Sequence, residues 1–114
     1  MKGRLREQCI ERLLKMPAEI ADAEDRVVQC VAELTTAKEA LEDAEARLLL
    51  SGEIDGKNAE ARRAQLRERT TAEREAVRKA EQALAQAKAE LAKAQVRLRA
   101  LEAIAALVRG EKTA

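Results

Sequence analysis

The chain has 114 residues and contains no Phe, Tyr, Trp or His, while charged residues make up 38% of it and leave a net charge of only +1. Because aromatic side chains normally fill much of a globular core, a chain rich in Ala, Leu, Glu, Arg and Lys indicates long helices or coiled coils instead. It has no apolar run long enough to cross a membrane and no signal-peptide pattern at its start, so we expect a cytoplasmic protein without a membrane partner.

The first half of the chain carries apolar residues at heptad spacing. Two series of positions seven residues apart interleave at spacings of three and four, which predicts one amphipathic helix over about residues 4–50. The heptad phase passes Pro17 unchanged, so we favour one helix kinked there, with a separate short N-terminal helix as the alternative. The two series are Leu13, Ile20, Val27, Leu34, Leu41 and Leu48, and Cys9, Met16, Ala23, Cys30, Ala37 and Ala44.

A loop is predicted over residues 51–58. Gly52 suits the left-handed conformation that often follows a helix end. Asp55 and Gly56 together are a turn signal, and Asn58 is a good N-cap for the next helix.

A second helix is predicted over about residues 59–109, with Gly110 ending it. It also carries two interleaved heptad series. These are Leu66, Ala80, Ala87, Ala94, Leu101 and Val108, and Thr70, Val77, Leu84, Leu91, Leu98 and Ala105. A period of 3.5 residues kept over this length favours a left-handed supercoil.

The predicted fold is all-α, with residues 1–114 forming a single domain: a long antiparallel helical hairpin, or left-handed coiled coil. Residues 18–50 carry nine acids and three bases, whereas residues 58–112 carry thirteen bases and eight acids, so the two helices attract each other. Pairing residues whose numbers sum to 107 sets large side chains against small ones, as with Leu84 and Ala23. Toward the loop this register is poorer.

Apolar residues that lie outside both heptad series cluster near the two termini. Residues 98–108 are apolar nearly all round, and a helix of that kind needs cover on several sides. We therefore predict a homodimer that forms a four-helix bundle at this end. The predicted dimer interface comprises Leu5, Ile10, Leu14, Ile104 and Leu107.

Catalytic and metal sites are not expected. The chain lacks histidine, and Cys9 and Cys30 lie too far apart on one helix to share a metal or form a disulfide. Both thiols have no base to activate them and are interpreted as reduced apolar residues between the helices. The sequence predicts a protein that is not an enzyme and binds no cofactor.

Arginines at spacings of four, seven and four fall on one face of the predicted second helix: Arg63, Arg67, Arg74 and Arg78. Such a face can follow a phosphate backbone, which makes a nucleic-acid-binding accessory protein the alternative function. Interleaved glutamates and the lack of aromatic residues for base stacking weigh against it. The simpler interpretation is that these arginines pair with glutamates and with the acidic first helix.

Within residues 51–66, SGEIDGKNAEARRAQL, the exposed tip residues Ile54, Asp55 and Lys57 are candidate contacts for a protein partner. This segment resembles one in small uncharacterised helical (coiled-coil) proteins of bacterial phages and prophages, where it joins two charged helices. The resemblance implies a phage-borne accessory protein in the host cytoplasm, acting near recombination genes or against a host defence system. The preferred hypothesis is a non-enzymatic interaction protein that binds or inhibits a protein partner.

Overall fold

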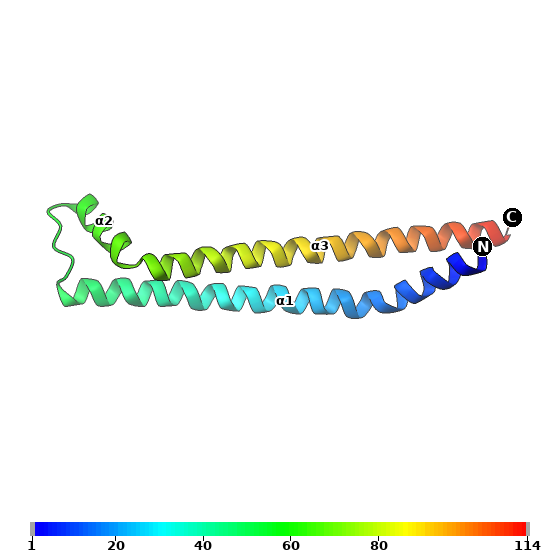
Figure 1. The fold of residues 1–114 in the computed structure, drawn as a ribbon, viewed down its shortest axis with the longest axis horizontal. Coiled ribbons are helices and arrows are strands. Elements are labelled where there is room, and N and C mark those ends of the chain that lie inside the picture. Colours follow the sequence, from blue (N-terminus) through cyan, green and yellow to red (C-terminus); the bar gives the residue numbers. More distant parts are fainter. Residues whose placement is uncertain (1, 114) are drawn as a thin grey trace. The chain divides into compact units, whose positions relative to one another are not determined.

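The computed structural model describes residues 2–113, and the side chains of residues 3–110. The described part of the chain is helical with one loop and no strand, which confirms the all-α helical hairpin (Figure 1). Its elements are α1 (Lys2–Ser51), α2 (Ala59–Arg69) and α3 (Thr71–Thr113).

The chain divides into two compact units that are built from the same two long helices. Unit 1 contains residues 1–28 and 86–114, and unit 2 contains residues 29–85. In each unit a segment of α1 packs antiparallel against a segment of α3. Unit 2 also contains the loop and α2.

Helix α1 continues through Pro17, so the alternative of a separate N-terminal helix is wrong. Proline has no N–H group to bond the carbonyl of Leu13, and its ring crowds that carbonyl. The first part of α1 is bent in Figure 1, as expected where a proline interrupts the hydrogen bonds of a helix. Burial of Cys9 and Met16 before the proline, and of Cys30 after it, keeps the heptad phase on both sides.

The buried residues occupy the predicted heptad positions. Between two helices only about one residue in three or four can be shielded from water, and the heptad selects those positions. The fully or nearly fully buried residues are Cys9, Met16, Cys30, Ala44, Thr70, Ala87 and Ala94. The rows of residues that meet between α1 and α3 are called the seam below.

The prediction of one continuous second helix over residues 59–109 is wrong in two respects: the helix is interrupted, and it extends beyond residue 109. It is interrupted at Thr70, whose backbone leaves the helical region at φ −118° and ψ 27°. The Thr70 hydroxyl donates to the Leu66 carbonyl over 2.6 Å, a local bond of the kind that competes with helix continuation. At the other end α3 passes through Gly110 to Thr113, because a single glycine costs a helix only about 1 kcal/mol.

The predicted register, with residue numbers summing to 107, is also wrong. In unit 1 Cys9 shares a cavity with Ala105, whereas the predicted register placed it opposite Leu98. In unit 2 Arg74 Nη2 lies 3.2 Å from Glu45 Oε1. With a rise of about 1.5 Å per residue, the predicted register would have separated these two by about 18 Å along the helices.

A shift of one heptad, to a sum of 114, fits both units. It sets Cys9 level with Ala105 in unit 1, and it sets the buried Ala44 level with the buried Thr70 in unit 2. The predicted register also set Arg63 opposite Ala44, whereas Arg63 lies on α2 and not on α3. The poor match near the loop was therefore a sign of the wrong register.

Candidate interaction sites

The loop of unit 2 is held to α2 by side chains that bridge the two. Gln65 accepts a hydrogen bond from the Gly56 N–H over 2.8 Å and donates to Asp55 Oδ1 over 2.7 Å. Arg62 donates to the Gly56 carbonyl over 3.1 Å. Asn58 accepts from the backbone N–H of Ala61 over 2.8 Å, which confirms it as the N-cap of α2. Gly52, as predicted, is left-handed with φ 75°.

Gly56 is required by space at this point. A Cβ atom there would lie 2.8 Å from backbone atoms of Ala61 and Arg62, closer than real Cβ atoms approach. Backbone atoms cannot move aside as a flexible side chain can, so the loop packs on the first turn of α2 only with glycine at this position.

The three loop residues predicted to bind a partner differ in their availability. Ile54 is half-buried, so its prediction as an exposed tip residue is wrong. Asp55 is exposed, but its carboxylate accepts a hydrogen bond from Gln65. Lys57 is exposed and forms no ion pair with a described residue.

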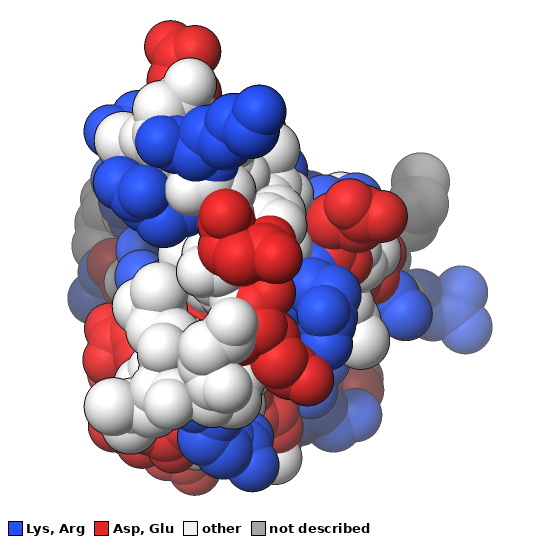
Figure 2. All heavy atoms as spheres, turned by 90° about the vertical axis from the view of Figure 1, so that its left-hand side faces the viewer, with Lys and Arg blue, Asp and Glu red and all other residues white. Residues whose placement is uncertain are grey.

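Exposed leucines at the end of α1 were missed by the sequence analysis. Leu50 keeps 87% of its surface exposed and Leu49 keeps 54%. The sequence could have indicated their exposure, since only Leu48 of the three consecutive leucines occupies a heptad position. Figure 2 views this end of the molecule and shows basic side chains gathered over α2 and an uncharged area below them.

The four arginines of the nucleic-acid hypothesis do not share one face, which corrects that prediction. The break at Thr70 puts Arg63 and Arg67 on α2 and the other two on α3. Arg74 is half-buried and bonds Glu45 and the Thr70 hydroxyl, the latter over 3.0 Å. Of these four arginines, only Arg63 and Arg67 are exposed and form no ion pair with a described residue.

The fourth arginine of that set, Arg78, is paired with a glutamate on its own helix. Its Nε donates to Glu75 Oε2 over 2.9 Å, and its Nη2 donates to Glu75 Oε1. These two hydrogen bonds lower the pKa of the Glu75 carboxyl below its ordinary value, and the same pairing raises the pKa of Arg78. The expectation that arginines pair with glutamates holds for this residue and for Arg74.

In unit 1 the predicted dimer residues are all exposed, but they do not form one patch. At about 100° per residue, Leu5 and Leu14 point in opposite directions from α1. Ile10 lies on the same side as Leu14 and lines a cavity between the helices, whereas Ile104 and Leu107 do not line it. Leu14 is 75% exposed. The structure therefore sets Ile10 and Leu14 on one side of α1 and Leu5 on the opposite side, and of the five only Ile10 lines the cavity.

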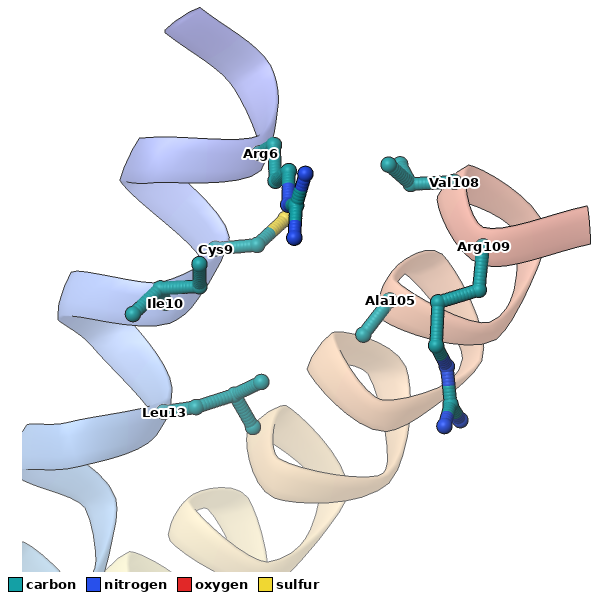
Figure 3. Close-up of a pocket in the computed structure, with 7 residues that line it drawn as sticks. All are labelled: Arg6, Cys9, Ile10, Leu13, Ala105, Val108 and Arg109. Atoms are coloured by element: carbon teal, nitrogen blue, oxygen red, sulfur yellow. The ribbon is translucent and has the colours of Figure 1, made fainter. Parts of the chain in front are cut away.

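The cavity beside Ile10 has a volume of about 170 Å³ (Figure 3). It forms because Cys9 and Ala105, both small, meet at one level of the seam, where most other levels set a large residue against a small one. Figure 3 shows Arg6, Cys9 and Leu13 pointing from α1 toward the α3 side chains. The lining residues are Arg6, Cys9, Ile10, Leu13, Ala105, Val108 and Arg109.

Among the described residues no three His, Cys, Asp or Glu side chains gather as metal ligands would. Cys9 and Cys30 are free and buried, which confirms the prediction that they are seam residues. No helix of the described chain is long and apolar enough to span a membrane.

Comparisons with known proteins give no relative. No protein-family model, no curated protein and no solved structure matches the chain.

Proposed function

We propose that the protein is a non-enzymatic interaction protein that binds, and thereby inhibits or recruits, a protein partner through the loop end of unit 2. The observation that carries the proposal is the way α2 is built. It leaves the line of α3 at Thr70 and is anchored to the loop by Asn58, Arg62 and Gln65. A hairpin needs only a short turn to close, so a separately capped and anchored helix at the turn favours a recognition element.

The surface offered by this end combines charge and apolar area. Lys57, Arg63 and Arg67 are exposed and have no ion-pair partner among the described residues. Leu49 and Leu50 add exposed apolar surface at the end of α1 in the same unit. A partner with an apolar contact surrounded by acidic residues matches this composition, because arginines are enriched among the residues that dominate binding energy and opposite charges steer partners together.

Self-association through unit 1 is the second part of the proposal. Ile10 and Leu14 are exposed on one side of α1, and exposed neighbouring apolar side chains usually mark an interface. Cytoplasmic location and a phage origin, in which the partner is a host protein, are proposed from the sequence alone, the latter from the resemblance of residues 51–66.

Photo-crosslinking in cells tests the binding end. A photoreactive amino acid is introduced in place of Leu50 in one variant and in place of Glu90, exposed on α3 in unit 1, in a matched control. We expect one discrete protein adduct from position 50, lost when Arg63→Ser and Arg67→Ser are added, and none from position 90. Adducts of equal yield from both positions, or none from position 50, contradict the proposal.

The same experiment separates the alternative function. If the adduct at position 50 contains nucleic acid, and the same crosslinking in cell lysate gives a yield that falls steeply with added salt, as phosphate contacts require, then Arg63 and Arg67 serve a nucleic-acid partner instead.

A further inference from the structure

We propose that the Asp55–Gly56 bond is a site of spontaneous isomerisation to isoaspartate, and that Gln65 suppresses this reaction in the folded protein. In the reaction the Gly56 nitrogen attacks the side-chain carboxyl carbon of Asp55. A C–N bond forms, and the hydroxyl of the carboxyl group leaves with the amide proton as water. Water then opens the resulting succinimide ring. Opening at the side-chain carbonyl restores aspartate, and opening at the main-chain carbonyl gives isoaspartate.

The Asp55–Gly56 pair has the composition that makes this reaction fast. A side chain on the residue that supplies the nitrogen hinders the attack, and glycine has none. No other Asp in the chain is followed by Gly. Asp55 is exposed in the loop between α1 and α2, whereas the other aspartates, Asp22, Asp25 and Asp43, lie within α1, where hydrogen bonds of the helix hold the backbone N–H groups.

The fold does not allow a larger residue to protect this bond. A Cβ atom at Gly56 would lie 2.8 Å from backbone atoms of Ala61 and Arg62, so the position requires glycine. Protection must therefore come from the contacts that the two reacting groups make with the rest of the chain.

Gln65 holds both reacting groups with one side-chain amide. Its Oε1 accepts the Gly56 N–H over 2.8 Å, and its Nε2 donates to Asp55 Oδ1 over 2.7 Å. The nitrogen that must attack and the carboxyl that must be attacked are therefore each bonded to Gln65. Because the ring closes only when the nitrogen gives up its proton and the carboxyl turns toward it, both hydrogen bonds must break first.

Arg62 anchors the same loop without bonding either reacting group. It donates to the Gly56 carbonyl over 3.1 Å. Replacing Arg62 therefore loosens the loop and leaves both hydrogen bonds of Gln65 in place, which separates the effect of Gln65 from that of loop mobility. Isomerisation would lengthen the main chain before Gly56 by one carbon and displace it from α2. The proposal concerns the chemical lifetime of the loop and does not depend on what the loop end binds.

Incubation in heavy-oxygen water at neutral pH measures the reaction, because each ring opening adds one heavy oxygen at position 55 whichever product forms. Mass spectrometry of the tryptic peptide over residues 48–57 gives the rate. Gln65→Met keeps the length of the side chain and should raise the rate about tenfold, since two hydrogen bonds no longer have to break. Gln82→Met, at an exposed glutamine on α3, is the matched control and should keep the wild-type rate. Circular dichroism checks that helix content is unchanged.

Three comparisons decide the outcome. Asp55→Glu should stop the labelling, because its longer side chain cannot close the same ring. In urea the wild type and Gln65→Met should react at one rate, faster than the folded wild type, and Arg62→Ser should accelerate the folded chain less than Gln65→Met does. A Gln65→Met variant with the wild-type rate, or an equal acceleration by Arg62→Ser, overturns protection by Gln65. An unfolded chain that takes up no label at position 55 overturns the site itself.

Discussion

At the scale of single residues, the loop of unit 2 depends on two positions that carry no charge. Gly56 allows the loop backbone to approach α2, and Gln65 joins the loop to α2 by accepting from one residue and donating to another. Two charged residues at this end, Asp55 and Arg62, form hydrogen bonds with Gln65 and with the Gly56 carbonyl. Their availability to a partner therefore depends on uncharged neighbours.

We expect Gly56→Ala to lower the free energy of unfolding by about 1–3 kcal/mol, because its Cβ would overlap backbone atoms that cannot move aside. Gly3→Ala is the control: nothing lies near a Cβ there, and alanine in a helix should raise stability by up to about 1 kcal/mol. Urea denaturation followed by circular dichroism measures both. Equal effects of the two substitutions would show that the close approach at Gly56 has no energetic consequence.

At the scale of elements, the break at Thr70 decides how α1 and α3 meet. Because the helix is interrupted there, the connection between the long helices includes α2 as well as the loop. The seam between α1 and α3 lies one heptad from the predicted register. The ion pair of Arg74 with Glu45 fits the shifted register, and the same arginine also donates to the Thr70 hydroxyl one turn before it.

The register can be measured by disulfide cross-linking in unit 1. With Cys9 and Cys30 replaced by Ala, the pair Ala23→Cys and Leu91→Cys should oxidise readily within one chain, because these positions are level when residue numbers sum to 114. The pair Ala23→Cys and Leu84→Cys, about 10 Å further along α3, is the control and should remain reduced. The reverse result would restore the sum of 107.

At the scale of the whole molecule, each compact unit contains one native thiol that reports on its opening. Cys9 belongs to unit 1 and is 5% exposed, and Cys30 belongs to unit 2 and is 2% exposed. A buried thiol reacts with a reagent only when the structure around it opens. The two rates of modification therefore follow the two units separately.

Both thiols should react far more slowly than a cysteine placed at the exposed Ala18. Cys9 should react faster than Cys30 in dilute protein, because it borders a cavity. Its rate should fall as protein concentration rises if the chain self-associates, as proposed, through Ile10 and Leu14 of unit 1. Quantitative mass spectrometry after timed alkylation measures both rates. Equal acceleration or slowing of both thiols with concentration would mean that association does not act at unit 1.

The sequence by itself determined the properties that repeat along a helix or act within a few residues. Heptad spacing predicted which residues are buried, from Cys9 to Ala94, and local chemistry predicted Asn58 as an N-cap and Gly52 as left-handed. These depend on helix geometry and neighbouring groups alone. For the same reason the pattern could not choose the register, because a heptad pattern shifted by seven residues still sets apolar positions against each other.

Only the tertiary structure decided which distant residues meet. The pairing of Arg74 with Glu45 depends on how the chain returns after the loop, and the heptad pattern does not show the break at Thr70. The choice comes from contacts between segments remote in sequence, whose energies the sequence pattern does not rank. The cavity at Cys9 and Ala105 is one result, because two small residues meet only in the register that the folded chain adopts.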